Sequence, residues 1–99
     1  MKLQVKGEEL MVNGENVFDA AAKAYLRPFV TPTKGIALRG FMDAVSDPNH
    51  EFAKHSSDYT LFEIGTFNEE TGLLTPMQTP SKVASAYELR PTNGDTNND

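Results

Sequence analysis

Two histidines five residues apart are the first candidates for chemistry in this 99-residue chain. The segment from His50 through Glu51 to His55 invites comparison with the helical zinc-protease motif H-E-x-x-H, but its spacing is one residue longer. On a helix of about 3.6 residues per turn, positions i and i+5 lie about 140° apart, so the two imidazoles would not meet on one metal ion. The sequence therefore predicts a solvated polar loop here, and no metal site.

Nucleophilic and acid–base catalysis find little support in the sequence. The chain has no cysteine, no G-x-S-x-G motif, no P-loop and no dinucleotide-binding fingerprint. The paired carboxylates Glu69 and Glu70 lie in a predicted turn, where solvent keeps them ordinary acids. We therefore predict a protein that is not an enzyme and has no catalytic residues and no cofactor.

The segment Thr31-Pro32-Thr33-Lys34-Gly35 has the features of an anion site at the start of a helix. A helix N-terminus exposes free N–H groups and carries a partial positive charge. Lys34 adds a cation in the first turn, and Gly35 lets a ligand approach the backbone closely. This segment is a candidate phosphate site; the alternative is an ordinary threonine cap beside a solvated lysine.

Tyr25, Arg27 and Phe29 alternate along a predicted strand, so we expect them to share one face. Two rings flanking a guanidinium suit single-stranded nucleic acid, because rings and arginine stack on bases while the charge meets phosphate. Alternatively, Tyr25 and Phe29 are core residues and Arg27 lies at the rim.

The charge of the chain weighs against general nucleic-acid affinity, because such proteins are usually basic. The formal net charge is −5, yet between Ala20 and Asp58 five basic residues stand against four acidic ones, so a local basic face is possible. Arg39 in this region could equally pair with Asp43, its i+4 neighbour. The candidate nucleic-acid contacts are the following cationic and aromatic side chains: Tyr25, Arg27, Lys34, Arg39, Lys54 and His55.

Length and composition predict one small domain over residues 1–90, followed by a polar tail over 91–99 that lacks large apolar residues and is expected to be disordered. With 38% apolar residues the core should be thin, so self-association into a homo-oligomer is expected. The absence of cysteine fits a reducing compartment. No apolar run is long enough to cross a bilayer and no signal peptide is evident, which predicts a soluble cytosolic protein without membrane contact.

The clearest predicted element is a helix over residues 33–46. It begins at a threonine cap and ends at Ser46-Asp47-Pro48-Asn49, because proline pushes the preceding residue out of the α region. Its apolar residues share one side at helical spacing: Ile36, Ala37, Phe41, Ala44 and Val45. Residues 50–58 after it are predicted to form a loop or a single turn.

The C-terminal half predicts a hairpin. Residues 60–67 form a strand with Phe62 and Ile64 on one face and Leu61 and Phe67 on the other, and residues 68–72 (NEETG) form the loop. Residues 73–79 return as a second strand, which two prolines confine to an edge. Residues 81–89 then form a short strand or a helical turn.

The segment before the helix is ambiguous. Asn13-Gly14 is a strong turn signal, so a hairpin with strands near 2–6 and 9–12, or a strand entering 16–19, would each fit. Propensity alone favours helix for 19–24 and strand for 25–31, with Pro28 placing that strand at an edge. Together the elements predict an α+β fold: a small, strand-rich, ββαββ-like domain with one central helix.

Residues 23–72 also carry a family pattern: KAYLRPFVTPTKGIALRGFMDAVSDPNHEFAKHSSDYTLFEIGTFNEETG. This segment closely resembles the small non-structural protein of gokushovirus-type microviruses, which are single-stranded DNA phages. The matching positions, together with Asp19, are Ala24-Tyr25, Pro28-Phe29, Thr33 to Phe41, Asp47-Pro48 to Tyr59, Leu61 to Phe67 and Thr71-Gly72. About ten extra residues precede Asp19, and three alanines follow it where the family has a more polar turn; a strand–turn–strand is still preferred to a helix there.

The resemblance implies a non-enzymatic phage protein that binds DNA, acting in viral genome replication or in the switch to single-strand synthesis inside the host bacterial cytoplasm. The expected ligand is single-stranded DNA, bound through stacking and phosphate contacts at the six residues named above. The alternative is a protein-interaction factor that engages the phage replication initiator or procapsid with little direct DNA contact. The acidic balance of the chain favours that alternative.

Overall fold

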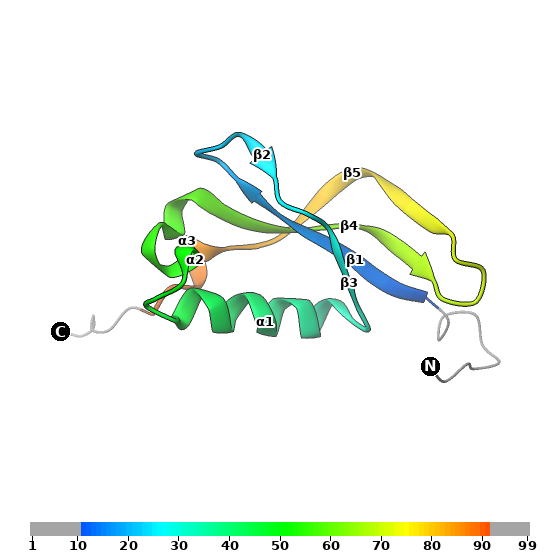
Figure 1. The fold of residues 1–99 in the computed structure, drawn as a ribbon, viewed down its shortest axis with the longest axis horizontal. Helices are drawn as coiled ribbons and strands as arrows, with labels where there is room; N and C mark the ends of the chain where they lie inside the picture. The colour runs from blue at the N-terminus through cyan, green and yellow to red at the C-terminus, as the bar shows by residue number, and fades with distance from the viewer. Residues whose placement is uncertain (1–10, 92–99) are drawn as a thin grey trace.

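The computed structural model describes residues 11–91, which form an antiparallel sheet packed on one long helix (Figure 1). Along the chain the elements are β1 (Met11–Asp19), β2 (Ala24–Tyr25), β3 (Phe29–Thr31), α1 (Lys34–Ser46), α2 (Glu51–Lys54), β4 (Tyr59–Asn68), β5 (Leu74–Ser85) and α3 (Ala86–Leu89). The sheet order is β2-β1-β4-β5, and β3 pairs with β1 beside β2. The predicted strand-rich α+β fold with one central helix is confirmed, with α3 added after the last strand.

The predicted turn at Asn13-Gly14 is wrong, because both residues lie within β1. β1 pairs with β4 along its whole length, from Met11 opposite Asn68 to Asp19 opposite Tyr59. The register shifts between Gly14 and Glu15, where Ile64 of β4 is the extra, unpaired residue. Pairing with strands on both sides thus outweighs the local turn preference. The expected strand over 16–19 is confirmed as part of β1, whereas the possible strand at 2–6 and the tail residues 92–99 lie outside the described residues.

Helix α1 matches its prediction closely. The Thr33 hydroxyl caps its N-terminus by accepting a hydrogen bond from the Ile36 N–H at 3.1 Å, and Asp47 is the C-cap. Ala37, Phe41 and Val45 are buried against the sheet. Ile36, expected on the same side, is 52% exposed and therefore lies at the margin of the buried face.

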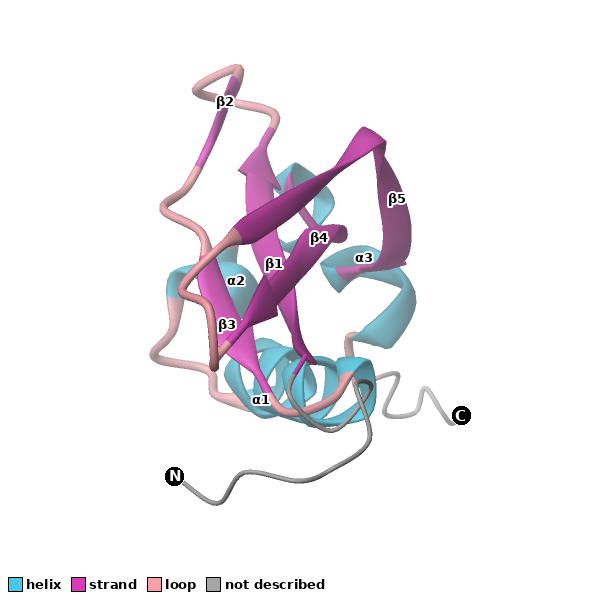
Figure 2. Ribbon diagram, turned by 90° about the vertical axis from the view of Figure 1, so that its right-hand side faces the viewer, coloured by secondary structure: helices cyan, strands magenta, loops and turns pink. Residues whose placement is uncertain are grey.

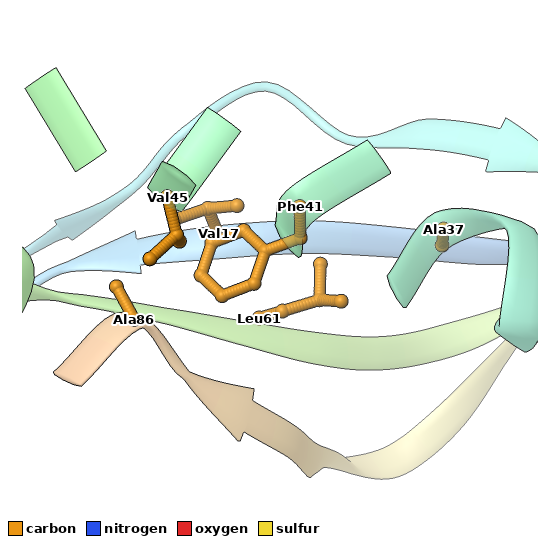
Figure 3. Close-up of a cluster of buried hydrophobic side chains, with 6 residues drawn as sticks. All are labelled: Val17, Ala37, Phe41, Val45, Leu61 and Ala86. Atoms are coloured by element: carbon orange, nitrogen blue, oxygen red, sulfur yellow. The ribbon is translucent and has the colours of Figure 1, made fainter. Parts of the chain in front are cut away.

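The core lies between α1 and the helix-facing side of the sheet (Figure 3). The ring of Phe41 occupies its centre and contacts the Phe52 ring at a centroid distance of 5.4 Å. The buried cluster draws on two strands and two helices: Val17, Ala37, Phe41, Val45, Leu61 and Ala86. Among residues 11–91, no helix is long and apolar enough to cross a membrane.

The β4–β5 hairpin confirms the predicted loop at 68–72. The Asn68 side chain accepts hydrogen bonds from the N–H groups of Glu70 and Thr71 at 2.9 and 3.1 Å, and Gly72 adopts a φ of +78°, which favours glycine. The predicted break between residues 79 and 81 is wrong, because β5 continues to Ser85. Residues 81–89 nevertheless combine both predicted alternatives, the end of a strand and then a helical turn.

β5 arches away from the sheet in its middle (Figure 2). Glu63 pairs with Ser81 and Gly65 pairs with Pro76, so residues 77–80 of β5 span a single residue of β4, Ile64. Pro76 is tolerated because β5 is an edge strand, as predicted from the two prolines. The arch rises on the side of the sheet that faces away from α1 (Figure 1).

Glu15 is a fully buried carboxyl on the helix-facing side of β1. Thr31 Oγ1 lies 3.1 and 3.2 Å from its two oxygens and 2.8 Å from the Thr33 carbonyl oxygen. The Thr31 hydroxyl has one proton to donate among these acceptors, so the Glu15 carboxylate receives it only in competition with the Thr33 carbonyl. Burial raises the pKa of Glu15 above its ordinary value of 4.5; the Thr31 hydrogen bond opposes this rise, and the Glu63 carboxylate adds to it.

We expect Glu15→Gln to reduce the pH dependence of the unfolding free energy. Because the folded pKa is raised, stability is highest below the unfolded value and falls as the pH rises through the folded pKa. Glutamine stays neutral, so the variant should be the more stable protein near pH 8, with the gap closing toward pH 4; each pKa unit corresponds to about 1.4 kcal/mol. Urea unfolding across this range measures the effect, with Glu69→Gln in the exposed loop as control. A constant stability difference at every pH would contradict the assignment.

Candidate nucleic-acid interface

The candidate interface is built on the hairpin between β1 and β2. The Asp19 side chain accepts hydrogen bonds from the N–H groups of Ala21 and Ala22 at 3.0 and 3.3 Å, and Lys23 adopts a φ of +56°. These two features turn the chain back on itself, so the helix that propensity favours for 19–24 does not form. The preferred strand–turn–strand is confirmed, and the hairpin projects beyond the body of the sheet (Figure 1).

Tyr25 presents an aromatic ring on this hairpin. Its ring centroid lies 4.8 Å from that of Phe18, its cross-strand partner, and 5.7 Å from that of Phe62 on β4. The two rings hold Tyr25 in place, yet Tyr25 remains 47% exposed. A fixed, half-exposed ring of this kind can stack on a nucleic-acid base.

The face predicted to unite Tyr25, Arg27 and Phe29 does not form, because the single strand expected over 25–31 is broken. β2 ends at Tyr25 and β3 begins at Phe29, with both strands at the same edge of β1. Tyr25 contacts Phe18 and Phe62, whereas Arg27 and Phe29 line a groove against α1. The prediction from Pro28 that this segment lies at an edge of the sheet is confirmed. The sequence did not predict that the segment around Pro28 would interrupt the strand.

Lys34 and Arg39 lie on α1, away from the Tyr25 ring cluster. Lys34 is the first helical residue and is exposed beside the Thr33 cap. Arg39 follows Ala37 by two residues, a rotation of about 200°, so it points away from the sheet that buries Ala37. Arg39 and Asp43, both described, form no ion pair with each other.

Lys54 and His55 lie beyond the far end of α1. Lys54 lines a shallow pocket with Val45, Ser46 and Arg90, next to the last turn of α1. Because α1 has 13 residues, its two ends are about 20 Å apart, and Lys34 and Lys54 belong to opposite ends. The His55 Nε2 atom lies 3.7 Å from a Glu51 carboxylate oxygen.

His50, the other histidine, has a structural role that the sequence did not predict. His50 is the N-cap of α2, where its Nδ1 atom accepts a hydrogen bond from the Phe52 N–H at 3.0 Å. The expected loop or single turn over 50–58 is therefore a capped helical turn followed by a 3₁₀ turn at Ser56–Asp58. Within residues 11–91, no group of three or more His, Cys, Asp or Glu side chains is arranged to hold a metal ion.

The six predicted contact residues therefore do not form one surface. Tyr25 lies on the β1–β2 hairpin and Arg27 follows it by two residues. The hairpin also carries the exposed Lys23, which the prediction left out. The supporting rings of Phe18 and Phe62 were also missed. Their signal was present in the sequence, since Phe62 was expected on one face of its strand, but the strand pairing that brings Phe18 next to it could not be predicted.

Comparison with known proteins supports a phage origin. The family model described as Phage ORF5 protein matches residues 16–89, from the middle of β1 to the end of α3. No curated protein shows a significant match to the chain. No solved structure does so either. The family match includes the β1–β2 hairpin, α1 and the β4–β5 hairpin, and on this basis the chain belongs to the Phage ORF5 protein family.

Proposed function

We propose that this phage protein binds single-stranded DNA in viral genome replication, or in the switch to single-strand synthesis, within the cytoplasm of the bacterial host. The resemblance of residues 23–72 to the small non-structural protein of gokushovirus-type microviruses motivates the choice of ligand. The function is one of binding and includes no catalytic step.

The observation that carries the proposal is the β1–β2 hairpin. Lys23 and Tyr25 are exposed on this hairpin, which projects from the sheet (Figure 1), and the exposed Arg27 follows β2 by two residues. A base stacked on the Tyr25 ring would place its neighbouring phosphates within reach of the two flanking cations. The rings of Phe18 and Phe62 hold the Tyr25 ring in place in the free protein, which limits the ordering cost of binding.

The charge of the chain limits how strong this contact can be. With a net charge of −5 and only Lys23 and Arg27 close to Tyr25 in the sequence, one copy can neutralise few phosphates. For single strands the logarithm of the binding constant falls with the logarithm of salt concentration by about 0.7 per phosphate contact, so a slope of roughly −1.4 is expected for two contacts. Stacking must then supply much of the affinity.

We expect Tyr25→Ala to weaken binding to a labelled oligothymidine by about 5- to 150-fold, because base–aromatic stacking contributes roughly 1–3 kcal/mol per base. Arg27→Ala should reduce the salt slope by about 0.7. Fluorescence anisotropy at low and moderate salt measures both effects.

Tyr87→Ala is the matched control for the stacking prediction. Tyr87 is 52% exposed, close to the exposure of Tyr25, but it lies on α3 with the Arg90 guanidinium 3.6 Å from its ring centroid. We expect this variant to bind as the wild type does. No binding by the wild type at low salt, or equal losses in both tyrosine variants, would overturn the proposal.

A second function is favoured by the negative charge near the turn of the β1–β2 hairpin. Burial raises the pKa of Tyr59, and the carboxylates of Asp19, Glu51 and Asp58 raise it further, so acidic groups gather around this ring. Such a surface suits a basic protein partner, as expected for a factor that engages the phage replication initiator or procapsid. Salt-sensitive binding to either of these phage proteins, without DNA binding at low salt, would favour this second function.

A further inference from the structure

An apolar groove is lined by residues of β3 and of the arch of β5. The arch lies on the side of the sheet that faces away from α1 (Figures 1 and 2). The volume of the groove is about 420 Å³. Gly14 lines it from β1, and Ile64 and Gly65 line it from β4. Val30 lines it from β3 and Met77 lines it from the arch.

The groove is an unusual surface for an isolated chain. None of the residues that line it has an ionisable side chain. Phe29, Val30, Leu74 and Met77, which line it, are all exposed large apolar residues. Leu73, directly beside the groove in sequence, is 66% exposed. A continuous apolar surface of this kind normally marks an interaction site.

The chemistry of the groove selects among possible occupants. DNA or a basic protein would need charged groups in the groove, and the lining provides none. Copies of this chain each carry a net charge of −5, so an uncharged face such as this one lets two copies meet with little local repulsion. The exposed Leu73 lies beside the groove, so the Leu73 side chain of one copy could fill the groove of a second copy. Because each copy then offers both a groove and a leucine, the contact is self-complementary about a two-fold axis.

The shape of the chain points the same way. Its Cα radius of gyration is 15.5 Å, with principal extents of 51 × 27 × 21 Å, whereas a compact domain of about 100 residues has a radius of gyration near 13 Å. The structure is thus extended. An arm such as β5, exposed from residue 74 to residue 82, would gain burial from a partner.

We propose that this groove is the contact between two copies of the chain, related by a two-fold axis, with Leu73 of each copy entering the groove of the other. The contact uses the β3–β5 side of the sheet and leaves the β1–β2 hairpin outside it. It therefore does not depend on DNA binding.

Sedimentation velocity over a concentration series tests the contact. The wild type should show a monomer–dimer equilibrium, and Val30→Glu should weaken dimerisation at least about tenfold, because it places an unpaired charge in the groove of each copy. Leu74→Glu, on the β5 side of the groove, should weaken dimerisation in the same way. If both variants do so, the loss does not come from a local distortion of β3. Far-UV circular dichroism confirms that each variant is folded.

Ile36→Glu is the matched control. Ile36 is 52% exposed and Val30 is 50% exposed, and the two substitutions add the same charge, but Ile36 lies on α1 and borders the other groove. We expect this variant to dimerise as the wild type does, and Tyr25→Ala likewise. A wild type that stays monomeric up to about 1 mM, or a folded Val30→Glu protein that dimerises normally, would overturn the proposal. So would an equal loss of dimerisation in Ile36→Glu.

Discussion

Phe41→Ala is expected to lower the free energy of unfolding by about 3–5 kcal/mol, the usual cost of deleting a buried phenylalanine ring. Phe41 is buried at the centre of the core, between α1 and the sheet, and contacts Phe52 on α2 (Figure 3). The surrounding cluster includes two alanines, which cannot rotate to fill the space left by the ring. Domains of this size have a total stability of about 5–15 kcal/mol, so the variant should be largely unfolded at modest urea concentrations.

Met42→Ala provides the comparison, because Met42 is the next residue of the same helix and is exposed. Alanine is the better helix former, so this substitution should change stability by less than about 0.5 kcal/mol. Urea unfolding followed by circular dichroism measures both variants. Similar stabilities for the two would mean that the α1–sheet core is not where this fold gains its stability.

Helix α1 was predictable because all of its signals are local. A threonine cap, a run of apolar residues at helical spacing and a proline stop lie within about 16 residues of sequence, and none depends on a distant partner. The loop at 68–72 was predictable for the same reason, since Asn68 and Gly72 satisfy its geometry from within. Capping groups and turn residues of this type act before any tertiary contact forms.

The errors occurred where distant pairing decides the structure. Asn13-Gly14 is a turn signal by itself, but in β1 it is held between β3 and β4, which are separated from it by about 17 and 52 residues in the chain. The arch of β5 depends on its register against β4, which the spacing of prolines does not reveal. Propensity cannot account for either outcome, because the free energy comes from pairing.

The residues of the predicted site lie apart for a related reason. Alternation along an unbroken strand places Tyr25, Arg27 and Phe29 on one face, but the segment Leu26–Pro28 separates two short strands instead. The sequence identified cationic and aromatic residues correctly as exposed groups, yet their grouping depends on how the hairpin folds against β1 and β4. Tyr25 lies on the hairpin with its two supporting rings, whereas Arg27 lies after β2 and lines the groove against α1 with Phe29.

Gly65→Ala is expected to destabilise the fold by about 1–3 kcal/mol, although it adds only one methyl group. A Cβ atom at this position would lie 2.9 Å from the Pro76 Cα and 3.2 Å from the Thr75 carbonyl carbon, and it would also collide with the Thr75 carbonyl oxygen. All three atoms belong to the backbone of β5, so no side-chain rotation can relieve the overlap. The strand itself would have to move away from β4 at the point where its arch begins.

Gly14→Ala is the control that separates this overlap from the general effect of replacing a strand glycine. Gly14 pairs with Gly65 across β1 and β4, but its nearest neighbour to an added Cβ is the Gly65 carbonyl oxygen at 3.5 Å, an ordinary contact. Because glycine in a strand costs about 0.5–1 kcal/mol relative to alanine, Gly14→Ala should be neutral or slightly stabilising. Thermal unfolding of the two variants distinguishes the causes: if both lose stability equally, the close approach of β5 is not the reason that glycine occupies position 65. If only Gly65→Ala is destabilised, the close approach of the β5 backbone to β4 is what requires glycine at position 65.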